Sequence, residues 1–278
     1  MLMKDVKAYY SSTVSKEWAR LRRDSYRRLE YQTTMHYLHK YLPPHGRVLD
    51  AGCGPGRYSM ELAKEGYRPT LFDLTPLSLE FARSMLKRKG LLSKVDAIAE
   101  GSIDDMACFP DDRFDGVICL GGPLSHLLDS RRRRRAAKEL VRVARPGAPV
   151  FASVMSRLGV LPIELARFQN EIELPLFREV CDTGDYDGAL EFTACHFFLP
   201  EELRSLMEGA GGETLDMAAL EFVPAPLDAD LDRLSRNRKR WDAWMYAHFK
   251  YCNHPGAVGS SDHMLIVCRK LRAGQADL

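Results

Sequence analysis

Three glycines and one aspartate are the first residues in this chain that could bind a ligand. Gly52, Gly54 and Gly56 lie in "VLDAGCGPG", between an apolar run and a segment of helical pattern. Glycine allows a ligand to approach the backbone closely, and free N–H groups at the start of the next helix attract polar or anionic groups. Asp73 ends the next apolar run, where a carboxylate can accept hydrogen bonds from ribose hydroxyls. Together these features predict a nucleotide-like ligand.

The glycine spacing narrows the choice of nucleotide. A dinucleotide fingerprint, G-x-G-x-x-G, needs glycine at its sixth position. Counted from Gly52, that position is Arg57, and the third glycine, Gly56, falls one residue early. The motif therefore disfavours a dinucleotide such as NAD and favours another nucleotide-like ligand.

Short apolar runs alternate with segments of helical pattern around these residues. Such alternation indicates an α/β protein with a doubly wound, mostly parallel sheet that helices cover on both faces. The carboxyl ends of the strands then form the edge at which a ligand binds. The predicted strands of this part lie at 48–49, 70–72, 95–99, 116–120 and 148–154, and the predicted helices at 58–65, 76–89 and 131–143.

The remaining segments flank or interrupt this pattern within what we expect to be one domain, 1–278. Residues 1–46 form a basic N-terminal helical cap, with a helix over 13–42. Residues 156–195 have no clear period, so we expect an insertion after the fifth strand that forms a lid or a wall of the substrate pocket. Pro200 suits the first turn of a later helix. The closing elements are expected as a strand at 214–219, a helix at 231–249 and a final, antiparallel strand at 263–270.

Four stretches in order resemble motifs of the class I S-adenosylmethionine (SAM)-dependent methyltransferases. They are "VLDAGCGPG", "TLFDLTPLSLEFAR", "AEGSIDDMACFPDDRFDGVICLGGPLSHL" and "ELVRVARPGAPVFASV", and the resemblance covers roughly residues 48 to 154. It implies the seven-stranded sheet of that family, SAM as the cofactor and methyl transfer as the activity.

The resemblance also implies roles for individual residues. Gly52, Cys53 and Gly54 would lie against the methionine part of SAM, Asp50 would order their loop, and Asp73 would hold the ribose. Leu74 and Ile103 would sandwich the adenine. Many relatives carry an acid where this chain has Ser102, whose hydroxyl can still accept a hydrogen bond. The residues expected at the methyl-bearing end are Leu120 and Gly121, which face the sulfonium, and Tyr10, whose segment folds over the cofactor.

Methyl transfer from SAM requires little acid–base catalysis by the protein. The methyl group is already activated on sulfur, so the enzyme mainly holds the nucleophile close and excludes water. A hydroxyl or protonated amine must also lose a proton, and His126, after the fourth strand, is the candidate base. The alternative is that His126 merely caps or packs its loop.

Charge and motifs leave three functions open. The 40 basic and 38 acidic side chains nearly balance, so bulk charge indicates no partner. The leading hypothesis is methylation of an O, N or S atom of a small molecule. The runner-up is methylation of RNA. The element order and Tyr251-Cys252 resemble the bacterial methyltransferases that esterify carboxymethoxy-uridine in tRNA. The arginines at 131–135 are interpreted as a solvated helix face, and the alternative is that they contact phosphates. The third is a SAM-binding protein without activity.

Other features of the sequence predict absences. The seven cysteines contain no C-x-x-C pair, and the histidines and Cys252 between 248 and 263 lack metal-ligand spacing, so no metal site is expected. We find no signal peptide and no apolar run long enough to span a membrane. A cytoplasmic protein without a membrane partner is therefore expected.

Overall fold

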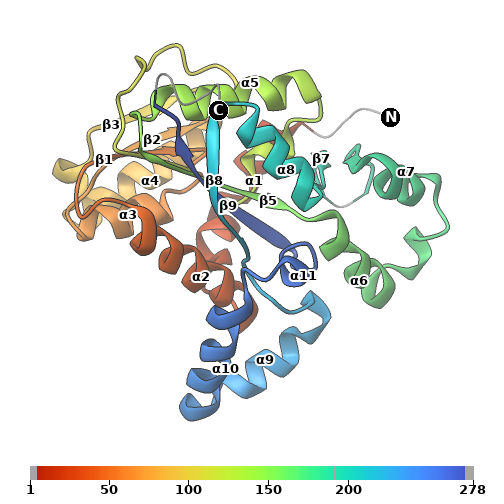
Figure 1. The fold of residues 1–278 in the computed structure, drawn as a ribbon. Coiled ribbons are helices and arrows are strands. Elements are labelled where there is room, and N and C mark those ends of the chain that lie inside the picture. The colour runs from red at the N-terminus through yellow and green to blue at the C-terminus, as the bar shows by residue number, and fades with distance from the viewer. Residues whose placement is uncertain (1–4, 191, 273–278) are drawn as a thin grey trace.

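Seven strands form one sheet in the computed structural model, which describes residues 5–190 and 192–272. Their order is β3-β2-β1-β4-β5-β9-β8; β1 to β5 are parallel, and β9 is antiparallel to both β5 and β8. This confirms the doubly wound, mostly parallel sheet and its antiparallel closing strand (Figure 1). The strands are β1 Arg47–Ala51, β2 Arg68–Asp73, β3 Ala97–Glu100, β4 Gly116–Cys119, β5 Pro149–Met155, β8 Gly212–Ala219 and β9 His263–Lys270.

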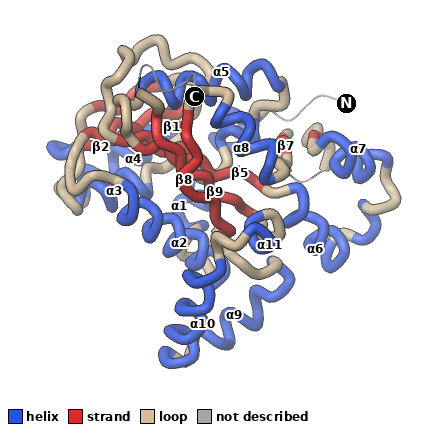
Figure 2. The backbone as a smooth tube through the Cα atoms, viewed as in Figure 1, coloured by secondary structure: helices blue, strands red, loops and turns tan. Residues whose placement is uncertain are grey.

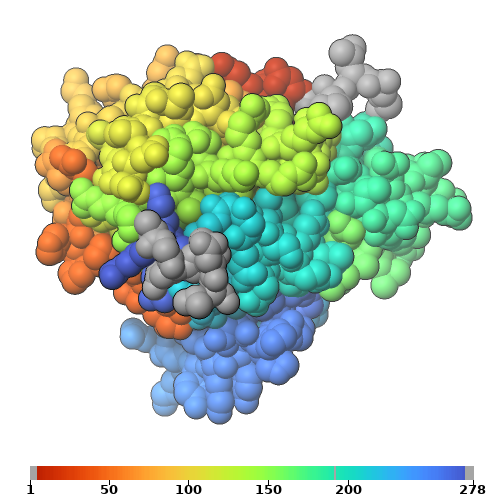
Figure 3. All heavy atoms as spheres, turned by 45° about the horizontal axis from the view of Figure 1, so that its top comes forward, coloured from red at the N-terminus to blue at the C-terminus, as the bar shows by residue number. Residues whose placement is uncertain are grey.

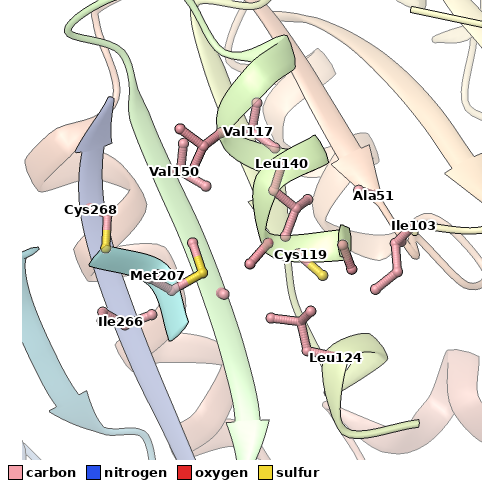
Figure 4. Packing of buried hydrophobic residues seen from close by; sticks show 14 of the residues in the cluster. Ala51, Ile103, Val117, Cys119, Leu124, Leu140, Val150, Met207, Ile266 and Cys268 are labelled. Carbon is pink, nitrogen blue, oxygen red and sulfur yellow. The ribbon is translucent and has the colours of Figure 1, made fainter. Parts of the chain in front are cut away.

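Helices cover both faces of the sheet because its strands are apolar on both faces. On one face, α5 (Ser130–Val143) and α8 (Pro200–Glu208) pack on the strands. Figure 4 shows Leu140 near Val117 and Val150, and Met207 near Ile266 and Cys268. On the other face lie α2 (Ser25–Tyr41), α3 (Arg57–Lys64) and α4 (Pro76–Arg88). Both faces of the sheet are thereby covered, and its carboxyl edge is left to form a site.

The N-terminal cap differs from the expected single helix over 13–42. It consists of α1 (Val6–Arg20) and α2, and the chain turns between them at Leu21 to Asp24. The Asp24 carboxylate accepts a hydrogen bond from the Arg27 backbone N–H at 2.7 Å and so begins a new helix. Tyr10 consequently lies inside α1 rather than before a helix.

The insertion at 156–195 is more regular than its sequence indicated. Ser156 caps α6, and Pro175 is the first residue of α7. Both helices are short, so they start at local signals and show no extended hydrophobic period in the sequence. Its base is fixed: the His196 ring lies 2.6 Å from Asp185 and 2.7 Å from Glu202 of α8. The elements are α6 Arg157–Arg167, the 3₁₀ turn η3 Gln169–Glu171, α7 Pro175–Thr183, and the strands β6 Asp185–Tyr186 and β7 Cys195–His196.

The helix expected at 231–249 is also two helices, α9 (Asp228–Ser235) and α10 (Arg238–Tyr251), because the Asn237 side chain caps α10. They project from the sheet beside α2, as the backbone tube in Figure 2 and the blue lobe in Figure 3 show. No helix in the described ranges is long and apolar enough to cross a bilayer. The remaining short elements are η1 Leu92–Lys94, η2 Pro123–His126, η4 Ala225–Leu227 and α11 Pro255–Val258.

Candidate active site

A cavity of about 550 Å³ lies at the carboxyl ends of β1, β2 and β4, and α1 forms one of its walls. Every residue that the sequence indicated for cofactor binding or catalysis lines it. These residues are Tyr10, Asp50, Gly52, Cys53, Gly54, Asp73, Leu74, Ser102, Ile103, Leu120, Gly121 and His126. The structure thus brings together side chains from six segments of the chain around one space.

Two glycines of the loop after β1 meet different constraints. Gly52 has φ +79°, and a Cβ there would lie 2.4 Å from the Pro123 ring, so η2 requires glycine at this position. Gly54 has φ +50°, and a Cβ there would meet no described atom within 4 Å. Gly54 borders the open cavity, and any side chain would occupy the space of a ligand lying against the loop.

Asp73 joins the end of β2 to this loop. Its carboxylate accepts hydrogen bonds from the backbone N–H of Gly54 at 2.7 Å and of Thr75 at 2.8 Å. Burial raises the pKa of Asp73, and these two hydrogen bonds oppose the rise. Each carboxylate oxygen has a further lone pair, so Asp73 can fix the loop and also accept hydrogen bonds from a ligand.

Asp50, on β1, lies beneath the same loop. Its side chain is buried and accepts a hydrogen bond from the Ser59 hydroxyl of α3 at 2.6 Å. Burial raises the pKa of Asp50 to about 7, although the Ser59 bonds lower it. Asp50 therefore connects β1 with the helix that follows the glycine loop.

The far end of the cavity contains an ion-paired group that sequence reasoning missed. The Ser102 hydroxyl donates to Asp104, and Asp104 binds Arg132 at 2.7 Å and Arg135 at 2.9 Å. Burial alone would raise the pKa of Asp104, but these partners lower it. The Ser102 hydroxyl oxygen can still accept a hydrogen bond from a ligand in the cavity, which Ser102 lines. The only signal in the sequence was an acid two residues after Ser102.

The interpretation of the arginine run as a solvated face is wrong for Arg133. That side chain is buried and donates to the carbonyls of Leu127 and Leu128. Arg132 and Arg135, although exposed, are held by Asp104. The run begins a helix whose preceding loop leaves carbonyls to be satisfied, and the guanidinium of Arg133 satisfies two of them.

His126 and Tyr10 form a hydrogen-bonded pair between α1 and η2. His126 Nε2 lies 2.6 Å from the Tyr10 hydroxyl, and His126 Nδ1 lies 3.1 Å from the Ala194 carbonyl. A carbonyl only accepts, so Nδ1 carries the hydrogen and Nε2 accepts from Tyr10. Burial lowers the pKa of His126 to about 4, opposed only by the Ala194 bond. The ring is therefore neutral near pH 7, and its lone pair is occupied.

This burial predicts acid sensitivity. In the unfolded chain His126 takes up a proton near pH 6.5, whereas the folded protein resists protonation until about pH 4. The free energy of unfolding should therefore fall as pH drops from 7 to 5, by about 2 kcal/mol from this residue. Urea unfolding at both pH values should show a smaller fall for His126→Gln than for wild type. The exposed His39→Gln variant is the control; an equal fall in all three proteins would contradict the assignment.

A second space continues from the first on the far side of Tyr10 and His126. It measures about 210 Å³ and shares Tyr10, Gly121 and His126 with the larger cavity. It leads into a chamber of about 220 Å³ under α6 and α7, with which it shares Met155, Val160, Ile163, Phe192 and Phe197. The chamber walls are mainly apolar. Further residues of its lining are Phe168, Leu174, Leu176, Phe177, Val180 and Leu190.

Charged residues gather at the other side of the second space. Arg20 pairs with buried Glu30, and the Arg27 guanidinium lies 3.9 Å from Glu30 and 4.0 Å from buried Glu221. The His263 ring binds Glu221 at 2.7 Å. Glu30, Glu221 and His263 are close enough to one another to hold a metal ion, but the two guanidiniums already supply the positive charge that both carboxylates need. No spacing in the sequence indicated this network.

Comparison with known proteins agrees with this arrangement. A methyltransferase domain family matches residues 48–147. The ubiquinone biosynthesis O-methyltransferase of Xanthomonas axonopodis pv. citri is 34% identical over 68% of this chain and 72% of that protein. The 2-methyl-6-phytyl-1,4-hydroquinone methyltransferase of Synechocystis is 33% identical over 73% of this chain and 58% of that protein.

Solved structures with a similar fold include methyltransferases. A SAM-dependent methyltransferase of Methanosarcina mazei superposes with a TM-score of 0.58 at 21% sequence identity, over 84% of this chain and 97% of that one. With the motifs, the seven-stranded sheet and the curated relatives, these findings define the class: the chain belongs to the class I SAM-dependent methyltransferases. It is an enzyme that uses SAM.

Proposed function

We propose that this enzyme methylates an oxygen atom of a small, largely apolar molecule held beneath the insertion. The observation that carries the proposal is the pair of connected spaces next to Gly121, of which the deeper is lined mainly by apolar side chains of α6 and α7. The Xanthomonas and Synechocystis relatives, a ubiquinone biosynthesis O-methyltransferase and a 2-methyl-6-phytyl-1,4-hydroquinone methyltransferase, support such an acceptor. The insertion then acts as a wall of the substrate pocket.

The residues of the larger cavity fit SAM. Gly54 leaves open space beside the loop, where the methionine part would lie against Gly52 and Cys53, and Asp73 keeps lone pairs for the ribose hydroxyls. Half-exposed Leu74 and buried Ile103 offer apolar surfaces to the adenine. Ser102 offers its oxygen beside them. When bound, SAM supplies a methyl group activated on a sulfonium, and Leu120 and Gly121 are the residues expected next to it.

In this proposal α1 roofs the cofactor and keeps water out. Three contacts hold it in place: Lys7 binds Glu100 at 2.7 Å, Tyr10 binds His126, and the Arg57 guanidinium lies 4.0 Å from the Trp18 ring centre. We assign His126 the role of positioning Tyr10, because its lone pair is occupied and its pKa is low. The protein's main contribution is then alignment of the acceptor and exclusion of water.

RNA is less favoured as the acceptor because the basic residues near the site are already engaged. Arg20 and Arg27 face buried carboxylates, and Arg132 and Arg135 bind Asp104. Phosphate contacts would have to come from exposed arginines of the run, of which Arg131 and Arg134 form no ion pair within the described ranges.

We therefore expect that replacing Arg131 and Arg134 by glutamine leaves kcat/KM for a small acceptor unchanged, since exposed charges contribute little to a closed pocket. The measurement is steady-state kinetics at two salt concentrations. The double variant spares Arg132, whose loss would disturb Asp104. A salt-sensitive gel shift with bulk tRNA that this variant abolishes would instead favour RNA.

The proposed function is tested with methyl-labelled SAM and three acceptors: 4-octylcatechol, catechol and bulk tRNA. We expect labelled product from 4-octylcatechol, and a KM for catechol that is higher by about 30-fold or more, since each buried CH₂ is worth about 0.8 kcal/mol. Label in tRNA, or no product from either catechol, would contradict the proposal.

A further inference from the structure

Asp262 is a buried carboxylate whose surroundings leave one oxygen without a partner. It directly precedes β9, it is only 7% exposed, and its backbone carbonyl accepts a hydrogen bond from Ser156 at 2.9 Å. The residue borders the second space, together with Gly121 and Val160. Among the described residues, no group donates to its Oδ1 atom.

An unpartnered carboxylate oxygen is costly inside a protein, and ligand binding is one explanation for keeping it. Among the described residues that contain a buried polar side-chain atom without a partner, Asp262 alone borders this space. Protein atoms cover Oδ1 in this structure, so a small rotation of the carboxylate would let a donor in the space, such as an acceptor O–H, supply the missing hydrogen bond.

The sheet places Asp262 at a suitable distance from the methyl-bearing end of the cofactor site. Gly121 follows β4, and β5 lies between β4 and β9, where Met155 pairs with His263. Neighbouring strands are about 4.8 Å apart, and the register places Asp262 two residues beyond the level of Gly121, so the two residues are separated by roughly 12 Å. A hydroxyl group that binds Asp262 can therefore lie between the carboxylate and the methyl group.

We propose that Asp262 binds the acceptor's hydroxyl group and takes its proton during methyl transfer. The proposal rests on the proposed function, which supplies the small-molecule acceptor. As the acceptor oxygen forms its bond to the methyl carbon, the carbon–sulfur bond breaks, and its electron pair remains on sulfur as S-adenosylhomocysteine (SAH). The O–H proton passes to the Asp262 carboxylate, which later releases it to water.

The groups around Asp262 support this role. Tyr26 and Arg27 face it from α2, Glu221 from the segment after β8, and His263 from β9. Burial and the negative charge of Glu221 raise the pKa of Asp262, whereas His263, Arg27 and Tyr26 lower it; burial and Glu221 prevail. A carboxylate with a raised pKa is a better proton acceptor than an exposed one. His126, by contrast, has no free lone pair.

The test compares Asp262→Asn with wild type on two acceptors. With 4-octylcatechol at pH 8 we expect kcat to fall about 100-fold or more, which is the rate loss typical of removing a general base. With 4-nitrocatechol, whose acidic hydroxyl is already ionised at pH 8, we expect a much smaller loss, because no proton needs to be taken. A residue with a merely structural role would lower both rates alike.

Two further measurements separate the outcomes. SAH affinity by calorimetry should be unchanged in Asp262→Asn and in the control Glu213→Gln, whose carboxylate pairs with Arg269 at the other end of the sheet. Asp262→Glu keeps a carboxylate and should recover part of the 4-octylcatechol rate. This variant tests the proposal even if Asp262→Asn folds poorly. Equal losses on both acceptors, or none, overturn the role of Asp262. A wild-type enzyme that methylates neither catechol overturns the proposed function itself.

Discussion

The Val160→Trp variant should lose about two orders of magnitude or more in kcat/KM for 4-octylcatechol while it binds SAH as wild type does. Val160 lines both the space next to Gly121 and the apolar chamber. An indole at this junction would close the passage that an apolar tail must use. The expected loss corresponds to several buried methylene groups at about 0.8 kcal/mol each. Kinetics and calorimetry together measure it.

Leu165→Trp is the matched control for this substitution. Leu165 lies on the same helix, α6, but its side chain is 64% exposed and lines neither space. It should leave kcat/KM nearly unchanged. If both tryptophan variants retain wild-type activity, the acceptor does not pass through the chamber, and the proposed role of the insertion fails.

The second large effect is expected at Asp73. Asp73→Ala should weaken SAM binding by about 10- to 150-fold, which corresponds to the 1.5–3 kcal/mol typical of hydrogen bonds to a charged group. The variant loses the proposed ribose contacts and also the bond that fixes the Gly54 backbone N–H. Calorimetric titration with SAM and SAH measures the change.

Two other variants make the result at Asp73 interpretable. Asp73→Asn keeps an oxygen for the Gly54 N–H, so it should weaken binding less than alanine does. Glu80→Ala removes an exposed carboxylate of α4, outside the cavity, and should have no effect. Wild-type affinity in Asp73→Ala would show that the ribose lies elsewhere.

Much of the fold was predictable because its signals are local. Each parallel strand is a short apolar run followed by a helical pattern, and the glycine loop after β1 marks the ligand edge. The boundaries that failed depend on single side chains. Asp24 and Asn237 each accept a backbone N–H and so divide a segment that periodicity alone interprets as one helix.

The gathering of the candidate site residues around one cavity was predictable for a related reason. Residues at the carboxyl ends of parallel strands, such as Asp73 and Gly121, lie at one edge of the sheet. The predicted antiparallel strand at 263–270 already places Asp262 at that edge, but its role was not predictable, because its burial depends on Tyr26, Arg27 and Glu221, which are distant in sequence. The role of His126 depends on Tyr10 and Ala194, which are distant in sequence, so no spacing could reveal that its lone pair is occupied.

The most direct test of this account is a crystal structure of the enzyme with SAH and 4-octylcatechol. We expect the homocysteine sulfur near Gly121, a catechol oxygen within hydrogen-bonding distance of Asp262, and the octyl chain between Val160 and Phe177 beneath α6 and α7. A catechol ring bound outside this space, with the apolar chamber empty, would contradict the account.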